Sequence, residues 1–247
     1  MSHSKGVSQL PSFSRLHERL REKSQDVRVR AVTYVAFGDS ITHGAMEHGI
    51  HEHVQLYHQI LRCKIVERYP TTLINVINSG VGGDTASAAL DRFERDVVLY
   101  RPDFLTIMFG ANDVHGGPQG LPLFSEAMLR MIRSVKCETE AEILIITPPM
   151  LAKHDNPYIQ DVHRDLVPGF FETELKGYTC LYVEALHHIA EEEHVPILDV
   201  YEMWRQMEQS GIDIHTRLAN GLNHPDREFH SQMAAAIATV LFSPEPI

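Results

Sequence analysis

Cysteine, basic charge and long apolar runs are all scarce in this chain of 247 residues. Its three cysteines, Cys63, Cys137 and Cys180, lie far apart and form no Cys-x-x-Cys pair, which argues against a disulfide framework and a cysteine-based zinc site. Lys and Arg number 22 against 33 Asp and Glu, a formal net charge of −11, so we expect no nucleic-acid partner. No stretch approaches the roughly 18 apolar residues of a membrane-spanning helix.

The first residues are polar where a secretory signal peptide needs an apolar core. Together with the few cysteines, this predicts a reduced, cytoplasmic protein. Residues 1–28 are expected to form a polar arm with one short helix at 13–24, and residues 29–247 a single domain. The sequence favours no particular oligomeric state.

Apolar runs rich in β-branched residues alternate with helical patterns through the rest of the chain. The expected strands are 32–37, 72–78, 104–110, 142–149 and 195–200, and the expected helices are 53–68, 85–99, 121–136, 170–194 and 226–242. Continuously apolar strands are typical of a sheet that is covered on both faces, so the alternation predicts an α/β fold with one parallel sheet. Ligands in such folds bind beyond the carboxyl ends of the strands.

Glycine-containing polar segments follow three of the expected strands, and another precedes the last helix. They are GDS (38–40), NSGVGGDT (78–85), GAND (110–113) and GLNHP (221–225). In this order and at these places they resemble the four signature blocks of the GDSL/SGNH hydrolases, a family of serine esterases and lipases. The resemblance covers the chain from about residue 32 to its end. It implies a flavodoxin-like, three-layer α/β/α fold with a five-stranded parallel sheet.

The resemblance also implies roles for individual residues. Ser40 would be the nucleophile and His224 the base, because a serine hydroxyl needs a base within about 3 Å to remove its proton. The backbone N–H groups of Ser40 and Gly83 and the side-chain amide of Asn112 would form the oxyanion hole. The expected activity is hydrolysis of a small-molecule ester, with acetyl as the acyl group, through an acyl-serine and without a cofactor. The alternatives are a lysophospholipase or thioesterase of the same family, and a non-catalytic ligand-binding relative.

The last segment departs from the family pattern, which usually has an aspartate three residues before the histidine. Gly221 stands there, and Asn220 precedes it where relatives often carry an acid. In a serine protease, replacing the acid by its amide costs about 10⁴-fold in rate. Three interpretations stay open. Asn220 or a backbone carbonyl orients the ring of His224; another acid, Asp226 or the more distant Asp213, replaces the missing one; or the base is disabled.

Histidine is abundant, with 16 in the chain and five between positions 43 and 58. Zinc ligation is conceivable there because His-x-His can chelate a metal. The chain has no His-Glu-x-x-His motif, however, and a polar loop that leads into a helix accounts for these residues, so we expect no metal site. His230, six residues after His224, lies on the last expected helix and ranks far below His224 as the base.

Overall fold

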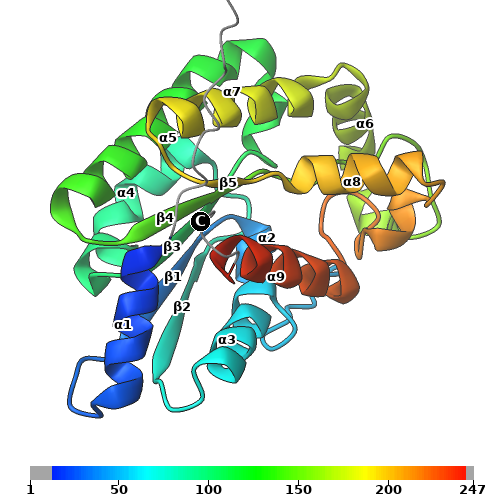
Figure 1. The fold of residues 1–247 in the computed structure, drawn as a ribbon. Helices are drawn as coiled ribbons and strands as arrows, with labels where there is room; N and C mark the ends of the chain where they lie inside the picture. The colour runs from blue at the N-terminus through cyan, green and yellow to red at the C-terminus, as the bar shows by residue number, and fades with distance from the viewer. Residues whose placement is uncertain (1–12, 243–247) are drawn as a thin grey trace, which may run out of the picture.

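A computed structural model describes residues 13–242, and its centre is one sheet of five parallel strands in the order β2-β1-β3-β4-β5 (Figure 1). The strands are β1 (Val32–Gly38), β2 (Ile74–Gly80), β3 (Phe104–Met108), β4 (Glu142–Ile146) and β5 (Ile197–Leu198). Every neighbouring pair is parallel. This strand order is the flavodoxin-like one, and it confirms the α/β fold class expected from the sequence.

Helices cover both faces of the sheet (Figure 1). One layer holds α1 (Ser14–Gln25), α3 (Tyr57–Arg68), α8 (Val200–Gln209) and α9 (Arg227–Phe242), and the other holds α4 (Ala86–Asp96), α5 (Gly117–Glu138) and α7 (Tyr178–Glu192). Successive strand residues point to opposite faces, so Tyr34 belongs to the first core and Val35 to the second. Between residues 13 and 242, no helix combines the length and the apolar character needed to cross a bilayer.

Shorter helices lie in the connections. They are α2 (Ser40–His43), α6 (Val167–Leu175) and the 3₁₀-helices η1 (Val98–Tyr100), η2 (Asp113–Gly116), η3 (Asp161–Leu166) and η4 (Ile214–Arg217). The expected helix over 170–194 is in fact two helices, α6 and α7, because Gly177 adopts a left-handed conformation with φ of 72° between them. The last strand is shorter than expected because the side chain of Asp199 caps α8 directly after it.

The amino-terminal helix α1 is part of the packed structure. Leu16 and Leu20 are buried, and the ring of Phe13 packs edge-on against Phe104 with 5.7 Å between the ring centroids. The arm expected over 1–28 therefore contributes apolar side chains to the core. Its residues 1–12 lie outside the described part of the chain.

The strand order also determines which loops meet at the carboxyl edge of the sheet. Because β1 lies between β2 and β3, the ends of these three strands are neighbours. The backbone N–H of Val81, after β2, donates to the carbonyl of Gly38 at 3.1 Å. Helix α9 packs beside α3, where the backbone N–H of Tyr57 donates to Nδ1 of His230 at 3.3 Å. This packing brings the loop before α9 to the same edge.

Candidate active site

Ser40 is the first residue of α2, which follows β1 after Asp39. The carboxylate of Asp39 caps this helical turn by accepting a hydrogen bond from the backbone N–H of Ile41 at 2.9 Å. Gly38 has no space for a side chain, because a Cβ atom there would lie 2.6 Å from the carbonyl oxygen of Met108. The Gly-Asp-Ser segment therefore ends the strand and places Ser40 at the edge of the sheet.

His224 lies beside Ser40, although 184 positions separate them in the sequence. Its Nε2 is 3.2 Å from Ser40 Oγ, and its Nδ1 is 2.9 Å from the backbone carbonyl oxygen of Met46. A carbonyl oxygen can only accept a hydrogen bond, so Nδ1 carries the ring proton and Nε2 keeps its lone pair for the serine hydroxyl. This is the tautomer that a general base for serine requires.

The surroundings of His224 favour its neutral form. Burial lowers the pKa of His224 below its usual value near 6.5, and the nearby His163 and His51 act in the same direction. The hydrogen bond to Met46 opposes them by raising the pKa. The imidazole is therefore uncharged at pH 7 and can accept a proton.

The loop that carries His224 is built around the side chain of Asn220. Its Oδ1 accepts hydrogen bonds from the backbone N–H groups of Leu222, Asn223 and His224, each at 3.0 Å. Its Nδ2 donates to the side-chain oxygen of Asn223 at 2.9 Å. Asn220 thus shapes the loop, whereas the ring nitrogens of His224 bond Met46 and Ser40, so Asn220 does not contact the imidazole as one interpretation of the sequence had suggested.

Gly221 explains why no aspartate stands three residues before His224. It adopts φ of 71°, which side chains rarely tolerate, and a Cβ atom there would lie 2.5 Å from the backbone nitrogen of Ile159. The side-chain amide of Asn156 also donates to the carbonyl of Gly221 at 2.9 Å. Any residue larger than glycine would have to displace the loop that packs against this position.

The acids considered as replacements are engaged elsewhere. Asp226 accepts a hydrogen bond from the backbone N–H of Phe229 at 2.7 Å and so caps α9. Asp213 accepts from Nδ1 of His215 at 2.7 Å. In the structure the carboxylate of Asp226 thus bonds the first turn of α9, whereas the ring of His224 bonds Met46 and Ser40.

The carbonyl of Met46 is therefore the acceptor for Nδ1 of His224. Sequence reasoning allowed for a backbone carbonyl but could not name the residue, because every residue has one. His230 is fully buried within α9, where its Nδ1 accepts the N–H of Tyr57, so it does not compete for Ser40.

The other two expected oxyanion donors lie on the loops after β2 and β3. Gly83 adopts φ of 75°, a left-handed conformation that favours glycine. A Cβ atom there would meet nothing within 4 Å, so steric crowding does not require glycine at this position. Nδ2 of Asn112 donates one N–H to the carbonyl of Asp84 at 2.8 Å and has a second N–H to offer. The backbone N–H of Ser40, at the start of α2, has no acceptor within its own helix.

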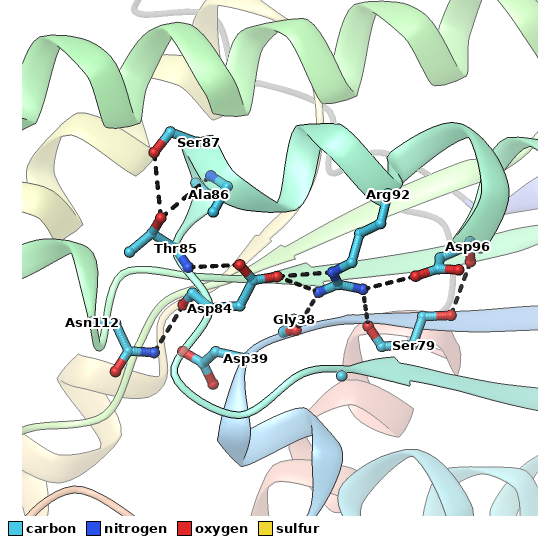
Figure 2. A network of polar contacts seen from close by, with 12 residues as sticks. Gly38, Asp39, Ser79, Asp84, Thr85, Ala86, Ser87, Arg92, Asp96 and Asn112 are labelled. Carbon is cyan, nitrogen blue, oxygen red and sulfur yellow. Dashed lines mark hydrogen bonds and ion pairs between the residues drawn. The ribbon is translucent and has the colours of Figure 1, made fainter.

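Arg92 of α4 bonds the carboxyl ends of β1 and β2 and the loop after β2. No sequence motif had pointed to this residue. Its guanidinium donates to the carbonyl of Gly38 at 3.0 Å and to the carbonyl of Ser79 at 2.8 Å. Its Nε donates to the carboxylate of Asp84 at 2.8 Å. Figure 2 shows Asp84 between Arg92 and Asn112, so one chain of contacts runs from the core of α4 to the side-chain amide of Asn112.

The carboxylates of Asp39 and Asp113 lie in the loops after β1 and β3, where Asp39 is buried and Asp113 is half-buried. The pKa of Asp39 is raised to about 7 and that of Asp113 to about 6, mainly by burial and in part by the charge of the nearby Asp84. Asp113 accepts hydrogen bonds from the backbone N–H groups of Ala86 at 2.9 Å and Gly110 at 3.1 Å. These contacts give Asp39 and Asp113 structural roles in the loops.

Within the described part of the chain, the histidines between 43 and 58 form no group with the spacing of metal ligands. The rings of His43 and His51 pack against each other with 4.7 Å between their centroids. Nε2 of His58 bonds the carbonyl of Thr42 at 3.1 Å. Within residues 13–242, one group of three side chains, His154, Asp213 and His215, has the spacing of metal ligands.

That group is poorly suited to hold a metal. Nε2 of His215 accepts the backbone N–H of Lys153 at 3.1 Å, and its Nδ1 bonds Asp213. Neither ring nitrogen of His215 is therefore free for an ion.

Comparison with curated proteins finds short matches. A stretch of 97 residues is 37% identical to the uncharacterized lipoprotein YqeF of Bacillus subtilis (strain 168), covering 39% of this chain and 38% of that protein. A stretch of 89 residues is 34% identical to an acetylxylan esterase of Geobacillus stearothermophilus, covering 32% of this chain and 40% of that protein. The chain thus spans about two fifths of the length of each of these relatives.

Solved structures match over much more of the chain. A catalytic mutant of Axe2, an acetylxylan esterase from G. stearothermophilus, superposes with a TM-score of 0.65 at 20% identity, covering 87% of this chain and 96% of that one. The lipase/acylhydrolase from Enterococcus faecalis gives a TM-score of 0.62 at 22% identity over 84% of this chain and 93% of that one. These likenesses establish the fold. Residues 36–231 match the GDSL-like Lipase/Acylhydrolase family as a whole, and the chain therefore belongs to that family.

Proposed function

We propose that this chain is a serine esterase that removes a small acyl group, acetyl, from an ester. The observation that carries the proposal is the contact of 3.2 Å between Ser40 Oγ and Nε2 of His224, with Nδ1 of the same ring on a backbone carbonyl. The choice of acetyl is supported by the curated relative that is named an acetylxylan esterase.

In the acylation step, Nε2 of His224 takes the proton of Ser40 as Oγ attacks the carbonyl carbon of the ester. The carbonyl oxygen becomes an oxyanion that faces the N–H groups of Ser40 and Gly83 and the side-chain amide of Asn112. His224 then gives its proton to the alcohol oxygen. The carbon–oxygen bond breaks, the alcohol leaves, and the acyl group stays on Ser40.

In the deacylation step, His224 takes a proton from water as that water attacks the acyl-serine. The second oxyanion collapses, the proton returns to Ser40 Oγ, and the carboxylic acid leaves. In both steps the imidazolium is supported by the dipole of the Met46 carbonyl. A neutral acceptor stabilises a cation less than a carboxylate does.

The test of this proposal is a series of p-nitrophenyl esters of increasing acyl length, with acetylated xylo-oligosaccharides measured in parallel. We expect kcat/KM to be highest for the acetyl ester and to fall as the acyl chain lengthens. A preference for octanoate over acetate would reject the acetyl assignment. An absence of hydrolysis across the whole series would reject the proposed esterase function.

The activity is expected to persist at mildly acidic pH. Because burial holds the pKa of His224 below 6.5, the acidic limb of the kcat/KM profile should have its midpoint below about 6.5. A midpoint above about 7 would contradict this account of His224.

Thermal unfolding at each pH is the necessary control for that profile. Burial lowers the pKa of His58 to about 4 and of His230 to about 3. Both histidines are therefore protonated in the unfolded chain at a higher pH than in the folded one. Their contribution to the free energy of unfolding is complete above about pH 6.5 and is lost progressively as the pH falls. Loss of activity through unfolding at low pH would therefore resemble the titration of His224.

Replacing Asn220 with aspartate is not expected to create a stronger base. An aspartate would still accept the three backbone N–H groups of the loop, but its second oxygen would face the side-chain oxygen of Asn223. We expect an unchanged or lower kcat and a loss of about 1–3 kcal/mol in the free energy of unfolding. A gain of about 100-fold in kcat, roughly 3 kcal/mol of transition-state stabilisation, would show that the new carboxylate reaches His224.

A further inference from the structure

The acceptor for Nδ1 of His224 is part of the main chain, so its position depends on how the loop 44–56 folds. The N–H of Met46 donates to the carbonyl of Ile50 at 3.0 Å, and the N–H of Glu52 donates to the carbonyl of Gly44 at 2.8 Å. These bonds close a small hairpin that presents the Met46 carbonyl. They do not by themselves attach this hairpin to the loop that carries His224.

Glu52 fixes the far side of the hairpin. Its Oε1 accepts the backbone N–H groups of His53, Val54 and Gln55 at 2.9, 2.8 and 3.2 Å. Its Oε2 accepts from Nε of Arg227 at 2.7 Å. The bond from Val54, followed by that from Arg227, lowers the pKa of Glu52 to about 2. The carboxylate is therefore charged at every pH at which His224 can act as a base.

Arg227 links the hairpin to the base. It is the first residue of α9 and lies three positions after His224. Besides bonding Glu52, its guanidinium lies 3.7 Å from the carboxylate of Glu47, the residue next to Met46. One cation thus contacts an acid on each side of the hairpin. Arg227 belongs to the same short segment as His224, whose Nδ1 bonds the Met46 carbonyl of the hairpin.

We propose that Arg227 and Glu52 are positioning residues that hold the Met46 carbonyl on Nδ1 of His224. They would supply by ion pairing the ring orientation that an aspartate near the histidine supplies elsewhere in the family. Neither residue touches the reacting atoms. The inference rests on the proposed esterase function for its effect on rate, but its structural part can be measured separately.

The variant Arg227→Met tests the proposal because it keeps the length of the side chain and removes its charge. Misplacing a catalytic group by about 1 Å can cost 100-fold in rate, so we expect kcat to fall about 10- to 100-fold. We expect KM to change little, because the ester contacts are untouched. Arg227→Lys should retain part of the activity, and Glu52→Gln should show a smaller loss in the same direction.

The direct readout is the proton on Nδ1 of His224. A hydrogen bond to a buried carbonyl slows its exchange, so the wild-type protein should show a downfield ¹H resonance that is absent from His224→Ala. We expect Arg227→Met to lose or broaden that resonance. The matched control is Arg133→Met, since Arg133 also joins two acids, Glu192 and Glu193, at 2.8 and 2.6 Å on the opposite helical layer.

The two readouts separate failure of this proposal from failure of the esterase function. Loss of both kcat and the resonance in Arg227→Met, with Arg133→Met unchanged, supports the positioning role. Persistence of the resonance in both Arg227→Met and Glu52→Gln overturns it, whatever happens to the rate. A lost resonance with wild-type kcat also overturns it. If no ester is hydrolysed, the resonance still decides whether the ion pair places the ring.

Discussion

Replacing Ser40 with alanine should lower kcat/KM for acetyl-ester hydrolysis by about 10⁴-fold or more. The hydroxyl of Ser40 is the atom that forms the acyl bond, and in the structure it lies 3.2 Å from the Nε2 that would take its proton. Water could still attack a bound ester facing the oxyanion donors, so a small residual rate is expected. The measurement is hydrolysis of p-nitrophenyl acetate with purified wild-type and variant protein.

His224→Ala should cause a loss of similar size, and the double variant should lose no more than either single one, because the two residues act as a unit. Ser134→Ala is the matched control. Ser134 lies on α5 and bonds Glu138 on the outside of the molecule. A Ser40→Ala protein that keeps more than about 1% of the wild-type rate would exclude Ser40 as the nucleophile.

The second large effect is expected at Asn112. Asn112→Ala removes a side-chain donor that would bind the oxyanion, and such a loss typically costs about 10²–10³-fold in kcat. KM should change little, because the donor acts on charge that is absent from the ground-state ester. The variant also loses the bond to the carbonyl of Asp84 at 2.8 Å, so thermal unfolding must accompany the kinetics.

An effect confined to KM, or a decrease in kcat below about threefold, would contradict the oxyanion assignment of Asn112. Asn112→Asp is a useful second variant. It is nearly isosteric but replaces a donor with an acceptor that faces the carbonyl of Asp84 and would also repel the oxyanion. It should therefore be at least as inactive as Asn112→Ala.

The fold was predictable because apolar strand-like runs and helical patterns are local features of the sequence and alternate along the chain. The strand expected over 32–37 contains residues such as Tyr34 and Val35 that are buried on opposite faces, and this leaves a continuous apolar run in the sequence. The end of the chain's last strand was harder to predict. Asp199 acts there as a helix cap, and only its contact with the backbone of Glu202 distinguishes that role from a strand residue.

In the candidate site, only the residues at motif positions could be predicted. Ser40 and His224 could be named because both occupy motif positions, and the structure places them in contact. The partner of Nδ1 could not be named, because the carbonyl of Met46 carries no residue-specific signal. The role of Asn220 was also hidden, since its bonds to three consecutive N–H groups depend on the folded loop.

Within residues 13–242, a backbone carbonyl and not a carboxylate bonds Nδ1 of His224, and this has a structural cause. Gly221 cannot become an aspartate without moving Ile159, and Asn220 is used to fold the loop. The ring is therefore oriented from the other side, by a hairpin that the sequence places more than 170 positions away. In the proposed mechanism, the dipole of the Met46 carbonyl supports the imidazolium of His224 in place of a charged acid.

The most direct test of the central claim is covalent labelling with diethyl p-nitrophenyl phosphate, followed by peptide mass spectrometry. An activated serine attacks this reagent and keeps the diethylphosphoryl group. We expect one such group on the peptide that contains Ser40, no label on Ser40→Ala, and much slower labelling of His224→Ala. A wild-type protein that remains unlabelled at Ser40, or that is labelled at another residue instead, would contradict the claim that His224 activates this hydroxyl.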